Sequence, residues 1–446
     1  MATLLLSTVL LQGQVTLPNP TLTLADGEGY TLTLPAAAGN RAIYTCDGAS
    51  WTWVPAANPF FRNGKWIAYL PPMDGSSRFY RVSTNPVIID SSLLTWGHEV
   101  ADQIEKTLRV KNSNLYSEAV TKTGTRFGGD SSRAYIWPVS TQFRTLNSLT
   151  SINPDARSEA LRAFADEVLL KYWSASGGYR SGLSANSDRF YDDNAHMVVA
   201  LCEAWLITGD DAYLERAEAT QQFVMSGEAP AGGGIYFATN QKSELDAGST
   251  LQGARAAALL YKCTGKAAYL TDARRQLDWA ATHIQQDNGA YYQWYWVTGA
   301  KANQADGSPL VNAISFALSA RVLLYETTGD LAELTEARRL AEAAIAKYID
   351  PDTKIRDEGY WAYELIEGLA NLYEIDPQSR WIVPARDALL WLHAHKRDPN
   401  GNYASLWGRD GDQTVALSQW TLNDMAAVAR AYLRVGLVRI ADEPAP

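Results

Sequence analysis

Two consecutive aspartates, Asp192 and Asp193, are the residues of this sequence whose type and spacing could cleave a covalent bond. Hydrolysis of the bond between two sugars requires one carboxylate and one carboxylic acid, which stand about 5 Å apart in retaining enzymes. Consecutive residues at the start of a helix can meet that separation. Two carboxyl groups this close repel each other, which raises the pKa of one of them and keeps it protonated for use as the acid.

The same pair has plainer interpretations. Apolar residues recur at helical spacing from Ala195 to Leu206, so Asp192 or Asp193 could be a helix cap or a first-turn acid that stabilises the helix dipole. With His196 one turn later the pair could also bind a metal, but the sequence offers no fourth ligand. We therefore expect neither a metal nor a cofactor.

Aromatic side chains are frequent, at 11% of the chain with 15 tryptophans, and several lie in glycine-rich loops. An aromatic ring suits a sugar-binding groove because a pyranose has an apolar C–H face that stacks on it. Tryptophans within helical patterns, such as Trp205, Trp279 and Trp391, are expected in the core instead. The candidate substrate-binding residues are Tyr191, Asn194, Gly233, Tyr236, Trp294, Tyr295 and Trp361.

A repeat indicates which elements position these residues. Three segments read as a helix, a Thr-Gly stop and a second helix, with the stops at Gly209, Gly265 and Gly329. Short turns thus alternate with long loops, which predicts stacked helix pairs in either an open superhelix or a closed ring. Because the long aromatic loops all fall on one end, we expect a closed (α/α) barrel in a mainly α protein.

The first part of the chain has a different pattern. Up to about residue 86, short apolar runs alternate with polar residues between Gly, Pro and Asn, which is typical of antiparallel strands. We expect a small β-rich domain over residues 1–86 and the barrel over residues 87–446. A carbohydrate-binding module, an attachment domain that docks onto a larger assembly and a structural lid are the three roles considered for residues 1–86.

Composition excludes several classes of partner. The net charge of −10 argues against nucleic acid, which is bound by clustered Lys and Arg. No run reaches the roughly 18 apolar residues of a membrane span, and residues 1–14 lack the basic start of a signal peptide. The three cysteines, Cys46, Cys202 and Cys263, have no disulfide or zinc spacing and are expected as buried free thiols.

The segment Tyr191–Ala195 resembles the central motif of glycoside hydrolase family 76, the endo-α-1,6-mannanases. Gly232–Phe237 and Leu417–Asp424 are similar to further segments of that family, and the resemblance covers roughly residues 90–436. It implies an (α/α)6 toroid that cleaves α-1,6-linked mannose backbones with retention of configuration. It also implies that Asp192 is the nucleophile and Asp193 the acid/base. Such a polysaccharide substrate favours an extracellular, cell-surface or virion-associated location.

Three other functions fit such a toroid. A glycan-binding protein without turnover, possible as part of a virion or cell-surface assembly, would need the groove but not the acids. Sugar epimerases on α/α toroids use histidine as acid and base, and His393-Ala-His395 is the one close histidine pair. Hydrolases of unsaturated glucuronyl sugars share the ring. Neither of these two enzyme classes accounts for the adjacent aspartates.

Overall fold

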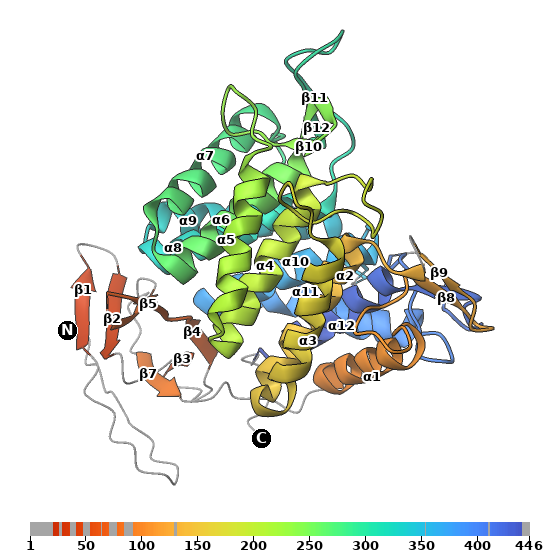
Figure 1. The fold of residues 1–446 in the computed structure, drawn as a ribbon. Coiled ribbons are helices and arrows are strands. Elements are labelled where there is room, and N and C mark those ends of the chain that lie inside the picture. The colour runs from red at the N-terminus through yellow and green to blue at the C-terminus, as the bar shows by residue number, and fades with distance from the viewer. Residues whose placement is uncertain are drawn as a thin grey trace.

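The computed structural model describes residues 21–25, 29–35, 42–47, 54–63, 65–70, 78–83, 92–128, 132–352, 354–408 and 411–438. Within these ranges the chain forms seven N-terminal strands and then twelve helices with short strands between them (Figure 1). The predicted mainly α fold preceded by β structure is confirmed. Residues 1–20, which include the start of the predicted β-rich domain and the segment 1–14 considered as a signal peptide, lie outside the described residues.

Six helices form an inner ring. Each inner helix packs against the next inner helix along the chain, and the last packs against the first. The ring is therefore closed rather than an open superhelix. Most of their residues are buried on all sides, as expected of helices in the middle of a protein. The inner helices are α2 (Ile136–Ile152), α4 (Tyr191–Thr208), α6 (Ala247–Thr264), α8 (Val311–Thr328), α10 (Gly359–Ile375) and α12 (Leu422–Gly436).

The other six helices form an outer layer, and each packs mainly against one inner helix. The first helix of the chain, α1, packs against the last, α12, so the start of the helical region lies next to its end. The arrangement is an (α/α)6 toroid. The outer helices are α1 (Ser92–Thr107), α3 (Pro154–Tyr172), α5 (Asp211–Met225), α7 (Ala267–His283), α9 (Leu331–Tyr348) and α11 (Ser379–Lys396).

The Thr-Gly turns connect inner to outer helices at one end of the ring, which we call the turn end. Gly209, Gly265 and Gly329 end α4, α6 and α8 in the left-handed conformation, with φ of 69°, 71° and 71°. Such a conformation favours glycine because a Cβ atom would clash with the backbone. The long loops lie at the other end of the ring, the loop end, as the repeat predicted.

Short strands stiffen the loop end. One sheet has the order β10-β11-β12-β13 and another the order β14-β8-β9, all antiparallel. The first sheet consists of Tyr236–Ala238, Gln241–Asp246, Trp294–Trp296 and Gln304–Asp306. The second consists of β14 (Gln419–Thr421), β8 (Ala119–Thr121) and β9 (Arg126–Phe127), and thereby joins the start of the helical region to its last helix.

The N-terminal strands form two sheets around a small core of their own that includes Leu32, Ile43 and Ala68. The first sheet has the order β1 (Thr21–Ala25), β2 (Gly29–Pro35), β6 (Lys65–Leu70) and β5 (Phe60–Arg62). The second has the order β4 (Val54–Ala57), β3 (Ala42–Asp47) and β7 (Arg78–Ser83). A domain division at residue 86 stays a prediction.

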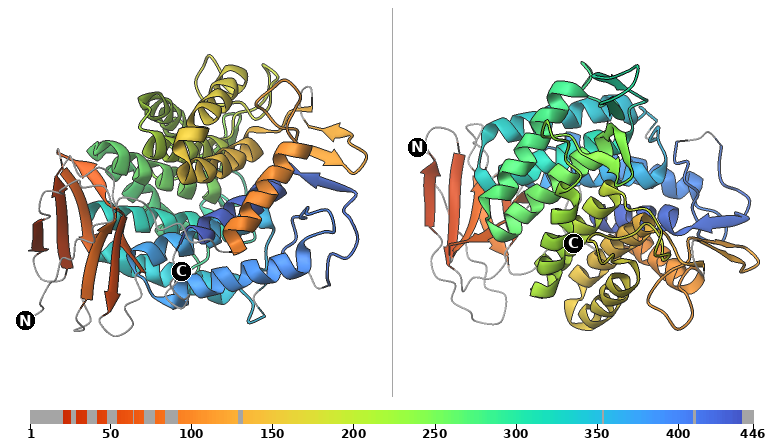
Figure 2. Two further views of the ribbon diagram at one scale, coloured as in Figure 1. Left: turned by 90° about the horizontal axis from the view of Figure 1, so that it is seen from below. Right: turned by 45° about the horizontal axis from the view of Figure 1, so that its top comes forward.

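These strands pack against the turn end of the ring (Figure 1 and Figure 2). The guanidinium of Arg62 lies 4.2 Å from the ring centre of Tyr261, near the end of α6, and donates a hydrogen bond of 2.8 Å to its hydroxyl. The amide of Asn58 donates to Glu326 at 3.0 Å and to Glu374 at 3.1 Å. The strands therefore cover the end opposite the long loops, where they cannot act as a lid over a loop-end site.

The middle of the ring contains charged residues instead of an apolar core. Arg144, Arg255 and Arg430 alternate with Glu364 and Glu367, and Glu203 joins at the edge. The Arg144–Glu364 contact is 2.9 Å and the Arg255–Glu364 contact is 2.6 Å. Burial alone would raise the pKa of Glu364, but these two guanidinium groups lower it to about 2. We call these six residues the ionic core.

The structure bears on the expectations for the cysteines and for membrane-spanning segments. Cys46, Cys202 and Cys263 are buried and form no disulfide, as predicted. No helix of the described residues is long and apolar enough to cross a membrane.

Candidate active site

Asp192 and Asp193 lie in the first turn of α4, at the loop end of the ring. Phe190 is the N-cap residue of α4, and its side chain accepts no hydrogen bond from the backbone N–H groups of the first turn. The side chain of Asp193 is 8% exposed, and Oδ1 of Asp192 is buried without a hydrogen-bond partner among the described residues. Of the two plainer interpretations, the helix cap is wrong because Phe190 occupies the N-cap position, whereas both aspartates are first-turn acids as the other interpretation has it.

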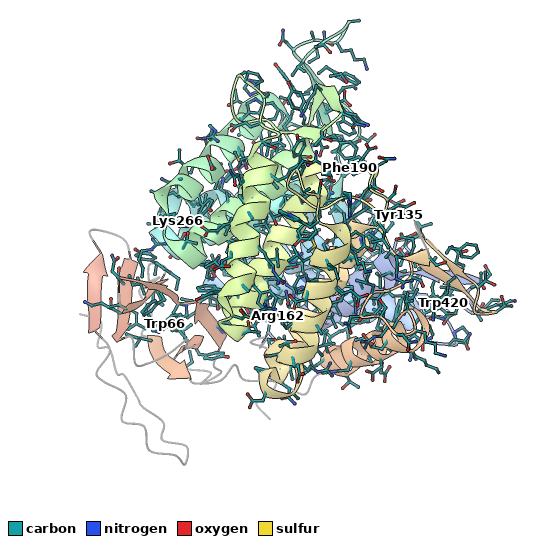
Figure 3. All side chains as sticks on the ribbon, in the orientation of Figure 1. Trp66, Tyr135, Arg162, Phe190, Lys266 and Trp420 are labelled. Carbon is teal, nitrogen blue, oxygen red and sulfur yellow. The ribbon has the colours of Figure 1, made fainter. Side chains whose placement is uncertain are left out.

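Both aspartates line a cavity of about 750 Å³. Its walls are the first turns of the inner helices together with the loops and short strands of the loop end. This volume lies within the range of small-molecule and sugar sites in proteins. Phe190 and Tyr135, both at its edge, lie on the opposite side of the molecule from Trp66 of the N-terminal strands (Figure 3).

The pair is held so that it binds a proton near neutral pH. Burial raises the pKa of both carboxyls, that of Asp193 to about 7. The negative charges of Asp193 and Asp246 raise the pKa of Asp192 further, whereas backbone N–H groups at the helix start act in the opposite direction. One carboxyl of the pair can thus be protonated while the other is ionised, which is what acid catalysis with a carboxylate nucleophile requires.

Asp246 is a third carboxyl in the cavity. It ends β11 and caps α6, where it accepts hydrogen bonds from the Ser249 N–H at 2.6 Å and from the Ser249 hydroxyl at 2.8 Å. Burial raises its pKa to about 6 despite these hydrogen bonds. Its charge is one of the causes of the raised pKa of Asp192, so it influences the pair without belonging to it.

Two groups of aromatic rings flank the pair. Trp137 of α2 stacks on Trp361 of α10 with ring centres 6.5 Å apart. On the other side, Phe237 contacts both Phe190, at 4.9 Å, and Trp294, at 5.6 Å. In the ring α4 lies between α2 and α6. Phe237 is in β10, which is followed by β11 and α6, and Trp294 is in β12, which pairs with β11. The acids therefore stand between two aromatic surfaces.

Four of the residues predicted from the sequence meet in this cavity. They are Asp192, Asp193, Trp294 and Trp361. Trp361 lies in the first turn of α10 and Trp294 in β12, so three separate segments bring them together.

Tyr191 and Asn194 lie outside the cavity lining, although they are neighbours of the pair in sequence. On a helix, successive residues point in directions about 100° apart, so the face directed at the cavity includes Asp192 and Asp193 but not the residue on either side of them. Tyr191 is buried and stacks on Phe223 at 5.1 Å. The amide of Asn194 accepts from the N–H of Tyr179 and donates to the carbonyls of Tyr179 and Phe190. Asn194 thus fastens the preceding loop to the helix start.

Gly233 and Tyr236 are also not in the lining. Gly233 has φ of 88° and packs so closely on Trp279 that a Cβ atom would lie 2.4 Å from it, which explains the glycine by backbone geometry. Tyr236 is half-buried beneath the ammonium group of Lys242, 4.4 Å from its ring centre. Its neighbour Phe237 is the residue that faces the cavity.

Tyr295 lies outside the cavity lining because of its position on strand β12. Successive side chains of a strand point to opposite faces, so Trp294 and Tyr295 cannot both face the cavity. Tyr295 packs instead against Trp279 at 5.5 Å and His283 at 5.3 Å.

The histidines separate into one at the cavity and four elsewhere. His196 lines the cavity one turn below Asp192, and its Nδ1 is 3.0 Å from the amide nitrogen of Gln252. Burial lowers its pKa to about 4. His393 and His395 are on the outer helix α11, where they contact Trp96 and Asp412. This close pair cannot supply the acid and base of an epimerase in the cavity. Among the described residues there is no cluster suited to a metal ion.

Several residues that line the cavity were not predicted from the sequence. Asp246, Glu118 and Asp424 add carboxyl groups, and Trp137 and Phe237 add aromatic rings. Each is contributed by a different segment, so no local motif marks them as a set. One available signal was the helix-start pattern Asp246-Ala-Gly-Ser249, in which an aspartate precedes a helix.

Six helix pairs closed into a ring, with a buried acid pair among aromatic rings at the loop end, place the molecule among the glycoside hydrolases built on an (α/α)6 toroid. It belongs to glycosyl hydrolase family 76, whose sequence profile matches residues 101–360. Among curated protein sequences none matches the chain.

Solved structures of the family are similar in fold. A family 76 α-mannanase from Bacteroides thetaiotaomicron is 24% identical, with a TM-score of 0.71 over 78% of this chain and 97% of that one. A family 76 glycoside hydrolase from a bovine strain of the same species is 16% identical, with a TM-score of 0.69 over 94% of this chain and 98% of that one. Residues after position 86 cannot supply 94% of the chain, so this second match includes part of the N-terminal strands. The likeness thus begins earlier than the sequence resemblance.

A third structure is a complex. It is an inactive variant of the α-1,6-mannanase from Salegentibacter sp. HEL1_6, with two consecutive aspartates replaced by asparagine and α-1,6-mannotriose bound. It is 13% identical to this chain, with a TM-score of 0.65 over 78% of this chain and 100% of that one.

Trp294 and Tyr295 are neighbours on β12 whose side chains point to opposite faces, so variants at these two positions form a matched pair. We expect Trp294→Ala to raise KM for a glycan substrate about 10-fold, because a sugar ring loses roughly 1.4 kcal/mol of stacking. Tyr295→Ala should leave KM within about twofold and lower thermal stability instead, since this ring packs away from the cavity. Initial-rate kinetics and thermal unfolding of both variants test this. An equal rise in KM for both would contradict the assignment of Trp294 to the cavity.

Proposed function

We propose that the chain is a retaining glycoside hydrolase that cleaves α-1,6-mannosidic bonds within a mannan backbone. Asp192 attacks the anomeric carbon to form a covalent glycosyl intermediate, and Asp193 protonates the departing oxygen. Asp193 then removes a proton from water, which releases the sugar from Asp192 with its original configuration. The observation that carries the proposal is the adjacent carboxyl pair in the loop-end cavity, with its raised pKa values.

The division of roles within the pair follows the family resemblance, which assigns Asp192 as nucleophile and Asp193 as acid/base. The backbone N–H groups of Asp192 and Asp193 and the positive end of the α4 helix dipole favour the ionised form of the Asp192 carboxyl. Burial and the negative charges of Asp193 and Asp246 act more strongly in the opposite direction and raise the pKa of Asp192 well above its usual range, whereas burial raises that of Asp193 to about 7. These shifts support a pair that holds one proton, and the separate roles are tested by the Asp192→Asn and Asp193→Asn variants.

The charges in the cavity support an uncharged substrate. Five carboxyl residues line it, namely Glu118, Asp192, Asp193, Asp246 and Asp424, and none of its described lining residues is a lysine or an arginine. A glycan that carries carboxylates, sulfates or phosphates would meet acidic side chains there and no described lysine or arginine to pair with. This favours a neutral hexose polymer such as mannan over the unsaturated glucuronyl sugars considered as an alternative.

The two aromatic surfaces support cleavage inside a chain. Sugar units on both sides of the bond at Asp192 and Asp193 would find a ring to stack on, with Trp137 and Trp361 on one side and Phe237 and Trp294 on the other. An enzyme that removes single terminal units needs such a surface on one side only.

The proposal is tested by product analysis. Purified protein is incubated with linear α-1,6-mannan and with α-1,2-, α-1,3- and α-1,4-linked glycans, and the products are separated by size. The expected result is a ladder of α-1,6-mannooligosaccharides whose new reducing ends are α-anomers in early NMR spectra. New β-anomers would overturn the double-displacement mechanism, and selective release from another glycan would overturn the linkage.

The pH dependence of activity should change when the third carboxyl is neutralised. In the wild type we expect kcat/KM to fall as pH rises above about 7, because the acid of the pair loses its proton there. The charge of Asp246 raises the pKa of Asp192, so Asp246→Asn should lower the pKa values of the pair and move this alkaline decline to lower pH. Asparagine also caps helices well, so α6 keeps its start. An unmoved or upward-shifted decline would contradict the coupling.

A further inference from the structure

A second pair of carboxyl residues, Glu118 and Asp424, lines the cavity away from the catalytic pair. Antiparallel pairing of β14 with β8 brings them together, and the N–H of Leu422 donates to the carbonyl of Glu118 at 2.8 Å. Asp424 belongs to the first turn of α12, whereas the catalytic pair starts α4, and α2 lies between these helices in the ring. The second pair is thus a separate place within the same cavity.

Helix capping accounts for one of the two carboxylate oxygens of Asp424 but not for the other. Thr421 caps α12: its hydroxyl accepts from the N–H of Asp424 at 3.1 Å and donates to Oδ2 of Asp424 at 2.7 Å. The other oxygen, Oδ1, is buried without a hydrogen-bond partner among the described residues, and the side chain as a whole is 7% exposed. A buried carboxylate oxygen left unpaired destabilises the fold, so a residue needed only as a cap would not be placed this way.

The surroundings of this oxygen have the chemistry of a sugar site. Glu118 accepts a hydrogen bond from the N–H of Tyr135 at 2.9 Å, which holds its carboxylate beside an aromatic ring. The ring of Tyr135 is 47% exposed and lines the cavity. Asn423 also faces the cavity and adds an amide. An exposed ring fits the apolar face of a pyranose, while carboxylates and an amide accept and donate hydrogen bonds at its hydroxyl edge.

We propose that Tyr135, Glu118 and Asp424 form a subsite that binds a neutral sugar unit away from the bond being cleaved, with a sugar hydroxyl donating to Oδ1 of Asp424. This inference rests on the proposed function only in that the ligand is a glycan. It makes Asp424 a residue that binds substrate without taking part in bond cleavage, and it predicts that long chains bind better than short ones.

The experiment measures binding as a function of chain length. In the Asp192→Asn/Asp193→Asn protein, dissociation constants of α-1,6-mannooligosaccharides of two to six units are determined by calorimetry. Affinity should rise with length in this parent. Adding Asp424→Asn should raise the dissociation constant of the longest ligand about 10-fold or more, which is the effect of losing a hydrogen bond to a charged group. The dissociation constant of the shortest ligand that binds should stay nearly unchanged. Tyr135→Ala, a surface change that leaves the helix cap intact, should give the same length-dependent loss.

The matched control is Asp330→Asn, which changes a helix-start aspartate at the turn end, where it caps α9. Its ligand affinities should equal those of the parent at every length. Equal affinities for the Asp424→Asn, Tyr135→Ala and parent proteins would overturn the subsite, and so would the same loss at all lengths. If the parent binds no mannooligosaccharide at all, the proposed substrate fails instead, so the two failures are distinguishable.

Discussion

Replacing Asp192 or Asp193 by asparagine is expected to lower kcat on α-1,6-mannan by at least about 1,000-fold. Asparagine keeps the shape of the side chain but can neither attack the anomeric carbon as a carboxylate nor donate a carboxylic acid proton. The variants should bind oligosaccharides about as well as the wild type, because the cavity keeps its aromatic walls. Turnover is measured by reducing-end release, and binding by calorimetry.

The chain contains a matched control for this experiment. Asp210 and Asp211 are also consecutive aspartates at a helix start, but they lie at the turn end, where Asp210 caps α5 and Asp211 is exposed. Asp211→Asn should retain full activity. If wild type and all three variants bind a glycan equally and none cleaves it, the enzyme proposal fails and a glycan-binding protein on the same toroid takes its place.

The second large effect concerns stability. Arg144→Met should lower the free energy of unfolding by about 3–5 kcal/mol, because it removes the partner of buried carboxylates that remain charged. Arg144 contacts Glu203, Glu364 and Glu367 and is fully buried. Its positive charge also contributes to the low pKa of Glu364. Urea unfolding followed by tryptophan fluorescence measures the change.

An exposed arginine provides the comparison. Arg162 on the outer helix α3 forms ion pairs with Asp166 and Asp210, all three of them partly in solvent. Arg162→Met should cost less than about 1 kcal/mol, since water screens such pairs. Equal losses for the two variants would show that the ionic core contributes no more than a surface pair.

Much of the frame was predictable because it depends on local rules. Gly209, Gly265 and Gly329 mark helix ends through their left-handed conformation, and that requirement is written into each turn. Asp192 and Asp193 were recognisable as a candidate pair for the same reason, since both belong to one segment.

The rest of the site depends on orientation and on contacts between distant segments. Trp294 and Tyr295 are equally plausible in sequence, and only the pairing of β12 with β11 decides which of them faces the cavity. Asp424 and Glu118 meet because β14 pairs with β8, a contact between the two ends of the helical region. Arg144 and Glu367 form an ion pair across the closed ring. None of these relations is visible in a local pattern.

The position of the N-terminal strands bears on what residues 1–86 do. Their contacts through Arg62 and Asn58 are with the turn end, so a carbohydrate-binding or attachment role for them would act at a distance from the cavity. Both roles remain predictions.

The alternation of inner and outer helices has an electrostatic consequence. Every inner helix starts at the loop end, so six helix N-termini converge on the cavity. Each carries roughly half an elementary positive charge from its aligned peptide groups. The backbone of the ring therefore supplies the positive field that five acidic side chains require, in a cavity whose described lining has no lysine or arginine. The parallel arrangement of the inner helices thus favours the ionised forms of these acidic side chains, in opposition to burial, which raises their pKa values.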